Sequence, residues 1–210
     1  AGAQASGFED GEKVPLELVL DNASRISNAV ECPVTLDIET GYSATPKGVK
    51  QTILKVIEAG IVGINLEDQN LHDSESCLYS IDEQVRRIAY AREAAEATSV
   101  PLFINARTDV FFKPLEEHDD EKLEEVISRA QAYAKAGANG IFVPGLTDEE
   151  MAKILCQNSP IPVNLMADSL ESDIAARYSK AGVARLSFGP CPYTHLMSRF
   201  TGLGKSILGN

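Results

Sequence analysis

One local pattern recurs along this chain and limits the folds that it can adopt. At three places a helical segment ends in Ala-Gly and leads within a few residues into a short apolar run: Ala59-Gly60, Ala136-Gly137 and Ala181-Gly182. Glycine readily takes the left-handed conformation that closes a helix and turns the chain back. Repeated strand–helix units with short connections predict a parallel sheet with right-handed crossovers.

The apolar runs and the helical periods between them define the units. The expected strands are residues 34–39, 62–67, 102–107, 140–143, 163–166 and 184–188, buried on both faces. Apolar residues at helical spacing predict helices over residues 16–30, 46–57, 82–97, 121–136, 169–180 and 193–208, with a further helix opened by a capping box at residues 147–150. Because no glycine-rich phosphate loop follows any strand, a (β/α)8 barrel is favoured over a doubly wound sheet.

The charge balance argues against several classes of function. Lys and Arg total 19 against 31 Asp and Glu, which gives a net charge of −12. A chain this acidic repels phosphate backbones and lipid headgroups, so no nucleic-acid or membrane partner is expected. No apolar run approaches the roughly 20 residues of a membrane span, and the start of the sequence shows no signal peptide. Four dispersed cysteines, without a C-x-x-C pair, agree with a reducing cytoplasm, which is the expected location.

Acidic side chains gather at the expected carboxyl ends of the strands, where parallel α/β proteins place their chemistry. The first strand ends at Asp37 and Glu39, which point to one side, and the second ends at Glu67. Three converging carboxylates repel one another unless a cation is present, and oxygen ligands favour magnesium or manganese over zinc. The third strand ends at Arg107, which can hold a carboxylate or enolate oxygen while Asp109 orients it. The pattern alone leaves open that these acids cap helices and pair with Arg107 as structural salt bridges.

Four motifs occur in an order that resembles the isocitrate lyase/phosphoenolpyruvate mutase superfamily: Asp37-Ile-Glu-Thr-Gly-Tyr42, Gly63-Ile-Asn-Leu-Glu-Asp68, Ile104-Asn-Ala-Arg-Thr-Asp109 and Ala136-Gly-Ala-Asn-Gly-Ile-Phe-Val-Pro144. The resemblance runs from about Gly7 to Leu208. It implies a (β/α)8 barrel and magnesium-dependent chemistry on 2-oxo acids or related carboxylates, with C–C or P–C bonds made or broken next to a pyruvate-like enolate. It also implies a homo-oligomer, a dimer or tetramer, in which the last helix is swapped between subunits.

The resemblance also implies roles for individual residues. Asp37 would bind magnesium directly, and Glu39 and Glu67 would act largely through water molecules. Arg107 would hold the substrate or the negative charge that develops on it.

Four further residues complete the candidate site. Asp10, in Gly7-Phe-Glu-Asp-Gly11, corresponds to the family's catalytic aspartate, whereas the pattern alone favours a turn residue before glycine. Asn164 is either a substrate contact or a strand residue whose amide bonds a neighbour. Gly2 and Ala3 correspond to part of the loop that binds the substrate carboxylate.

The chain departs from the family where the reaction is decided. The lyases carry a Lys-[Lys/Arg]-Cys-Gly-His loop after the strand that ends in Glu67, and the Cys is the general acid/base. Here Cys77 lies two residues beyond that place without the flanking Lys, Gly and His, so it is interpreted as incidental. The Lys and Asn of the mutase loop are missing as well. Pro144 stands where lyases have Glu and mutases have His, and Ser43 stands where Gly is usual.

The sequence therefore predicts a magnesium-dependent lyase-like enzyme on a separate branch of the phosphoenolpyruvate phosphonomutase/methylisocitrate lyase-like proteins. It would act on a small 2-oxo or 2-hydroxy carboxylic acid through an enolate. Two alternatives remain: a hydrolase of an oxaloacetate-like or phosphonopyruvate-like substrate, and a catalytically inactive ligand-binding or assembly subunit.

Length adds one further expectation. Only six strand–helix units are recognisable in 210 residues, whereas a (β/α)8 barrel takes about 250. We therefore expect a single barrel domain over residues 1–210 that contains strands 3–8. The first two strands would be missing from this N-terminally incomplete chain, or a partner chain would fill the gap.

Overall fold

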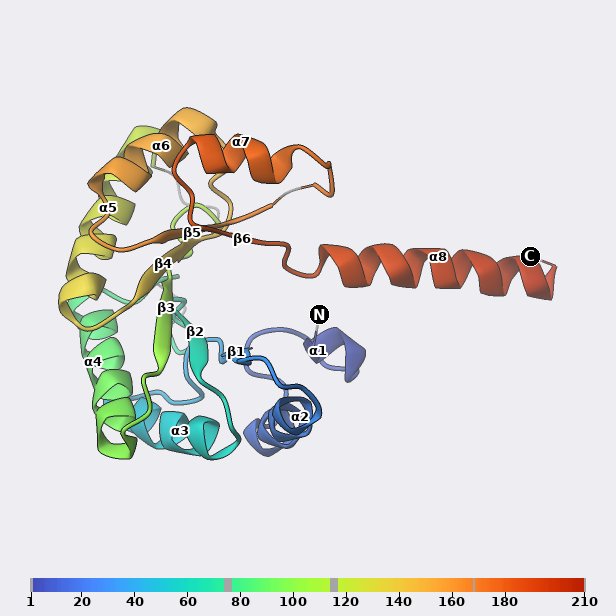
Figure 1. The fold of residues 1–210 in the computed structure, drawn as a ribbon, viewed down its shortest axis with the longest axis horizontal. Helices are drawn as coiled ribbons and strands as arrows, with labels where there is room; N and C mark the ends of the chain where they lie inside the picture. Colours follow the sequence, from blue (N-terminus) through green and yellow to red (C-terminus); the bar gives the residue numbers. More distant parts are fainter. Residues whose placement is uncertain (1, 74–76, 114–116, 168, 210) are drawn as a thin grey trace.

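The computed structural model describes residues 2–73, 77–113, 117–167 and 169–209. Six strands form one parallel sheet in the order β1-β2-β3-β4-β5-β6, which curls into part of a barrel (Figure 1). The strands are β1 (Thr35–Asp37), β2 (Gly63–Glu67), β3 (Phe103–Arg107), β4 (Gly140–Val143), β5 (Val163–Met166) and β6 (Arg185–Ser187). The expected α/β class and parallel sheet are confirmed, and each strand lies within its predicted range. Two further strands before β1 remain a prediction.

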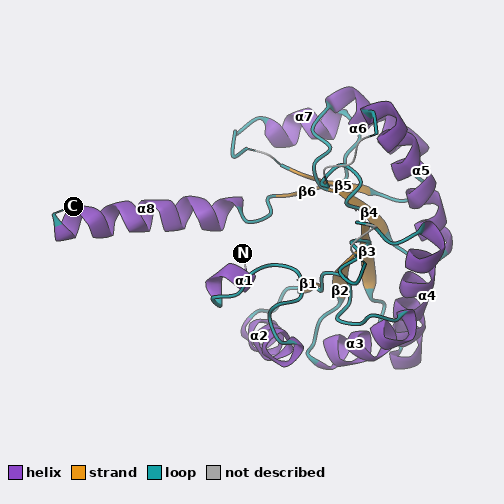
Figure 2. Cartoon of the chain, turned by 180° about the vertical axis from the view of Figure 1, so that it is seen from behind, coloured by secondary structure: helices purple, strands orange, loops and turns teal. Residues whose placement is uncertain are grey.

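Eight helices lie in the described part of the chain. They are α1 (Gly2–Ala5), α2 (Leu16–Ala29), α3 (Pro46–Glu58), α4 (Ile81–Thr98), α5 (Asp119–Lys135), α6 (Glu149–Asn158), α7 (Ile174–Lys180) and α8 (Cys191–Leu208). Helices α3 to α7 wrap the convex side of the sheet, whereas α8 projects away from it (Figures 1 and 2). No helix in these described ranges is both long enough and apolar enough to cross a membrane.

Local sequence signals account for most helix ends. Gly60, Gly137 and Gly182 have φ of 84°, 104° and 95°, which is the left-handed conformation predicted for the ends of the preceding helices. Two predicted starts were wrong. Helix α6 is capped by Asp148 rather than Thr147, because the Asp148 side chain accepts a hydrogen bond from Met151 N–H at 2.8 Å. Helix α7 begins at Ile174, five residues after the predicted start.

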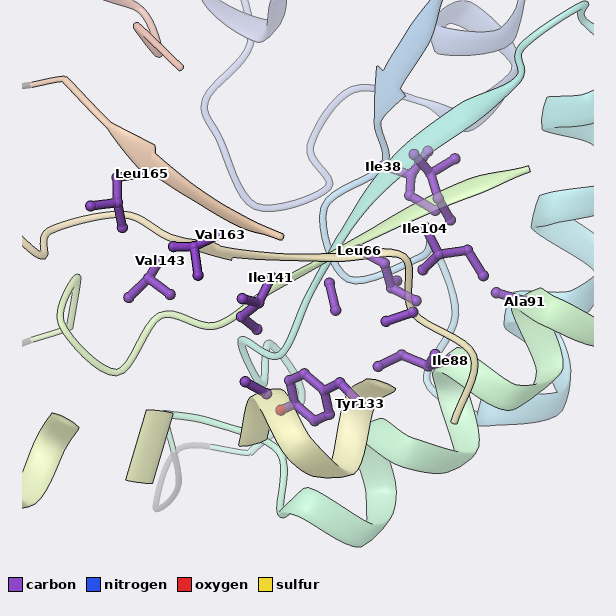
Figure 3. Close-up of a cluster of buried hydrophobic side chains, with 14 of the residues drawn as sticks. Ile38, Leu66, Ile88, Ala91, Ile104, Tyr133, Ile141, Val143, Val163 and Leu165 are labelled. Atoms are coloured by element: carbon purple, nitrogen blue, oxygen red, sulfur yellow. The ribbon is translucent and has the colours of Figure 1, made fainter. Parts of the chain in front are cut away.

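The two faces of the sheet differ sharply in character. Residues that point outward from β2, β3, β4 and β5 are apolar and buried against the surrounding helices, where they form the main core (Figure 3). They include Ile64, Leu66, Ile104, Ile141 and Leu165.

Strand alternation turns the other set of side chains toward the inside of the curl, and many of these are polar: Asp37, Asn65, Glu67, Asn105, Arg107 and Asn164. The predicted burial on both faces is confirmed for β4, all four of whose residues are buried, whereas the inward faces of β2, β3 and β5 carry polar residues. The concave face is free to carry the site.

Candidate active site

A cavity of about 510 Å³ opens at the carboxyl ends of β1, β2 and β3. Its lining includes all but one of the predicted site residues: Gly2, Ala3, Asp10, Asp37, Glu39, Glu67 and Arg107. Helix α1 lies beside β1 (Figure 1). The cavity therefore brings residues of the first segment, such as Asp10, next to residues at the ends of β1, β2 and β3. Asn164 is the exception, since it does not line this cavity.

The segment after β1 carries two of the predicted metal ligands. Asp37 is exposed, and its Oδ1 accepts a hydrogen bond from Glu39 N–H at 3.0 Å. Glu39 has φ of 50°, which turns its side chain into the cavity. Gly41 completes the turn with φ of 102°, where a Cβ would lie 3.1 Å from the Val49 side chain. The turn therefore requires glycine at this position.

Partial burial raises the pKa of the Glu39 carboxyl, and the negative charges of Asp10, Asp37 and Glu12 raise it further. A hydrogen bond from Glu12 N–H to Glu39 Oε2 opposes this shift. The resulting charge density is what a cation would relieve.

Glu67, at the end of β2, is 4% exposed and faces Arg107. Arg107 Nη1 lies 2.8 Å from Glu67 Oε2. Burial nevertheless raises the pKa of Glu67 to about 8, with Asp109, Asp37 and Glu39 adding to the effect and Arg107 opposing it.

Arg107 is held on both edges of its guanidinium. Besides the contact with Glu67, its Nε and Nη2 donate to the two carboxylate oxygens of Asp109 at 2.6 and 3.0 Å. Burial tends to lower the pKa of Arg107, but Glu67 and Asp109 outweigh it, so the group stays charged. The predicted orientation of Arg107 by Asp109 is present, and so is the alternative expectation that strand-end acids form salt bridges with this arginine.

Asp68 follows Glu67 but points to the opposite side, where it supports the site from behind. It is completely buried, and its Oδ2 accepts hydrogen bonds from Arg129 Nη1 at 2.9 Å and Tyr133 Oη at 2.8 Å. Its Oδ1 accepts from Asp109 N–H at 3.0 Å. This network fixes the residue that orients Arg107.

Two residues that the sequence analysis did not select hold the segment after β1. Glu12 Oε1 accepts hydrogen bonds from Thr40 Oγ1 and Tyr42 N–H, both at 2.6 Å. Arg87 Nη2 donates to the carbonyls of Thr40 and Ser43, both at 2.7 Å. The sequence did contain a signal for Arg87. It lies four residues before Ala91 and eight before Ala95, so its charge falls on the buried face of α4 and requires a buried partner.

The substitution of Ser43 for the usual glycine is accommodated locally. Ser43 Oγ donates to Thr45 O at 3.0 Å and accepts from Thr45 N–H at 3.1 Å, which shapes the entry into α3. Its side chain occupies the space that a Cβ on Gly48 would fill.

The remaining candidates lie elsewhere. Asn164 Oδ1 accepts a hydrogen bond from Ser187 Oγ at 3.1 Å, as its alternative interpretation expects, and its Nδ2 is buried without a hydrogen-bond partner among the described residues. Cys77 lines a separate cavity of about 660 Å³, together with Ser80 and Arg129, which agrees with its interpretation as incidental to the site.

The donor set can be tested against a metal ion. Within the described ranges, no group of three or more His, Cys, Asp or Glu side chains is close enough to hold an ion. Asp37 is exposed, whereas Glu39 and Glu67 are engaged by Glu12 N–H and Arg107. These oxygen donors fit a hydrated hard cation with few direct protein ligands better than a closed coordination cage.

Sequence comparison identifies the family. The sequence model of phosphoenolpyruvate phosphomutase matches residues 1–208. The chain belongs to this family. Its relatives in the isocitrate lyase/phosphoenolpyruvate mutase superfamily are lyases and phosphonomutases, as the sequence motifs predicted.

Three relatives show the range of the family. The chain is 30% identical over 192 residues to an uncharacterized protein of Mycobacterium tuberculosis, with 91% of the chain and 67% of the relative covered. It is 31% identical over 167 residues to 2-methylisocitrate lyase of Escherichia coli, with coverages of 77% and 53%. It is 26% identical over 170 residues to oxaloacetate decarboxylase of Pseudomonas putida, with coverages of 79% and 55%. The chain thus spans only about half the length of the last two.

Solved structures agree with this assignment. A Burkholderia cenocepacia protein assigned as a phosphonomutase is 44% identical, with a TM-score of 0.89 over 97% of this chain and 80% of that one. A 2,3-dimethylmalate lyase is 25% identical, with a TM-score of 0.84 over 100% and 72%. A phosphonopyruvate hydrolase solved with oxalate and Mg²⁺ shares the fold, with 20% identity and a TM-score of 0.80 over 99% and 70%.

Proposed function

We propose that this family member is a magnesium-dependent lyase-like enzyme. It would make or break a C–C or P–C bond next to the carbonyl of a small 2-oxo or 2-hydroxy carboxylic acid, through an enolate. The observation that carries this proposal is the single cavity that gathers Asp10, Asp37, Glu39, Glu67 and Arg107. A non-catalytic protein would have little reason to retain such mutually repelling carboxylates in one cavity.

The proposed roles are those that the family resemblance implies, and the exposure and contacts of the residues support them. Asp37, the exposed carboxylate, would bind Mg²⁺ or Mn²⁺ directly, and Glu39 and Glu67 would bind its water ligands. A bound ion supplies Lewis-acid stabilisation to an enolate-like oxygen. Arg107 adds a fixed positive charge, and its two carboxylate partners prevent it from turning away.

The remaining site residues would act on the substrate. Asp10 reaches the cavity from the segment after α1 and would act as the catalytic aspartate. Gly2 and Ala3 line the same cavity and would contribute to binding the substrate carboxylate. Asn164 would act from the adjoining part of the concave face.

A hydrolase or decarboxylase of an oxaloacetate-like substrate is the second candidate, with a phosphonopyruvate-like substrate as its variant. The similarity to oxaloacetate decarboxylase over 79% of the chain supports it. The absence of the lyase Cys motif instead supports the third alternative, a catalytically inactive ligand-binding or assembly subunit.

We also propose a homo-oligomeric, cytoplasmic protein. None of the described α8 residues is buried, and α8 stands clear of the sheet, so a second copy of the chain would cover its apolar side chains, by helix swapping as in the family (Figure 2).

The metal assignment is tested by calorimetric titration of oxalate, with and without Mg²⁺, and by NMR detection of methyl proton exchange of pyruvate in heavy water. The wild-type chain should give magnesium-dependent binding or exchange, and Asp37→Ala should abolish it. Asp120→Ala, an exposed acid on α5, is the matched control. Retained metal-dependent binding in Asp37→Ala would refute the metal assignment. If the wild type shows neither binding nor exchange, the inactive ligand-binding alternative is favoured.

A further inference from the structure

Glu12 makes three hydrogen bonds that join two segments of the candidate site. It lies two residues after Asp10, and all three partners lie in the segment that follows Asp37. Its side chain accepts from Thr40 Oγ1 and Tyr42 N–H at 2.6 Å each, and its own N–H donates to Glu39 Oε2. The side chain of Glu12 therefore fixes the path of the segment that follows Asp37, and its backbone N–H fixes the carboxylate of Glu39.

The joined segments are conformationally demanding. Glu12, Glu39 and Tyr42 have φ of 58°, 50° and 53°, a left-handed conformation that side chains other than glycine adopt rarely. Such conformations persist when the surrounding structure determines them. The hydrogen bonds of Glu12 connect all three strained residues, so each segment stabilises the conformation of the other.

Arg87 secures the same segment from α4. Its guanidinium is completely buried, donates to the carbonyls of Thr40 and Ser43, and stacks 4.3 Å from the centre of the Tyr79 ring. Thr40 is thus held through its hydroxyl by Glu12 and through its carbonyl by Arg87. Because α4 packs against the sheet, this anchorage ties the segment to the rigid part of the fold.

We propose that Glu12 is a positioning residue that locks the Asp10 segment onto the segment of Asp37 and Glu39, so that the aspartate and the metal-binding carboxylates are aligned before any ligand arrives. The inference rests on the proposed function for its catalytic consequence, but the lock itself is a property of the fold. It adds to the site a residue that touches neither metal nor substrate. Prearranged groups lower the cost of assembling a site during binding.

The test compares Glu12→Ala with Glu9→Ala, an exposed glutamate of the same segment. Mn²⁺ affinity is measured by electron paramagnetic resonance, and turnover by pyruvate proton exchange. Glu12→Ala should weaken Mn²⁺ binding by about tenfold and lower kcat more than it changes KM, since hydrogen bonds to a charged group are lost. Glu9→Ala should match the wild type. Glu12→Gln, which keeps an acceptor oxygen, should recover most of the loss.

A double mutant separates a specific lock from general damage. Thr40→Val removes the hydroxyl partner, so Glu12→Ala/Thr40→Val should bind Mn²⁺ about as well as Glu12→Ala alone. Additive losses, or wild-type affinity in Glu12→Ala, would overturn the proposal.

Amide hydrogen exchange provides a readout that does not depend on metal or activity. Exchange at Tyr42 N–H should accelerate at least about tenfold in Glu12→Ala. Glu12→Gln should restore the protection of this amide. Circular dichroism verifies that both variants fold. If the wild type binds no Mn²⁺, the proposed function fails, and unchanged Tyr42 exchange would separately refute the lock.

Discussion

Arg107 Nη1 lies 2.8 Å from Glu67 Oε2, so a fixed cation stands against one of the carboxylates predicted to surround the metal. The other edge of the guanidinium pairs with Asp109, which in turn is held by Asp68. The contacts with Glu67 and Asp109 therefore fix the orientation of the Arg107 guanidinium. This arrangement offsets the charge of Glu67 but not that of Glu39 and Asp37, and it makes the geometry of Arg107 as important as its charge.

Arg107→Lys should reduce the rate of metal-dependent pyruvate proton exchange by at least about 100-fold, although the charge is retained. A lysine ammonium cannot contact Glu67 and bind both oxygens of Asp109 at the same time. The rate is measured by NMR at saturating Mg²⁺. Arg86→Lys, at an exposed position on α4, is the matched control and should leave the rate unchanged. A loss of less than about threefold in Arg107→Lys would contradict a geometric role for the guanidinium.

The pKa of Glu67 leads to a pH-dependent stability of the metal-free protein. Its folded-state pKa of about 8 lies above the value of about 4.3 for an unfolded chain, so the folded protein binds an extra proton between these values. The contribution of Glu67 to stability is therefore fully present below about pH 4.3 and is lost as pH rises through about 8.

Urea unfolding between pH 5 and 9 tests this expectation. The free energy of unfolding should fall with pH in the wild type and fall less in Glu67→Gln. Some dependence should remain, because burial raises the pKa of Glu39 and Asp109 in the same direction. Glu58→Gln, an exposed change on α3, should keep the wild-type slope. Equal slopes in Glu67→Gln and the wild type would show that Glu67 is already ionised.

The parallel order of the strands and most helices followed from the sequence because each depends on local signals. Apolar runs, helical spacing and closing glycines act over a few residues, and they predicted six strands in the correct ranges. Side-chain alternation, also local, places Asp37 and Glu67 on the cavity side of β1 and β2. Glu39 reaches the same cavity by another route, because it lies beyond the end of β1 in a left-handed turn with φ of 50°. The early helix start at residue 169 was wrong, because the pattern marks which residues are apolar and not where the backbone begins to coil.

The support of the site was missed because it depends on contacts between distant residues. Glu12 meets Thr40 across 28 positions, and Arg87 meets it across 47. No local sequence pattern indicates contacts between residues this far apart in the chain. A buried charge on an apolar helix face, as at Arg87, is the one signal that would have prompted a search for a partner.

Arg129→Met should destabilise the protein by about 3–5 kcal/mol, since it leaves the carboxylate of Asp68 buried with its main positive partner removed. Tyr133→Phe removes one neutral donor to the same oxygen and should cost less, about 1–2 kcal/mol. Lys153→Met, at an exposed ion pair on α6, controls for the loss of a surface charge. Urea unfolding gives all three values. A cost below 1 kcal/mol for Arg129→Met would indicate that Asp68 is stabilised by other groups.

Helix α8 makes the oligomeric state testable. Leu196, Phe200, Leu203 and Ile207 recur at helical spacing along one face and are 65%, 69%, 58% and 75% exposed. A continuous apolar stripe of this kind is expected to be covered by a second copy, so sedimentation should give a mass at least twice 22.6 kDa. Phe200→Glu places a charge in the stripe and should shift the protein to monomer. Ser198→Glu adds the same charge on the opposite face and should not. A wild-type monomer at micromolar concentration would disprove this expectation.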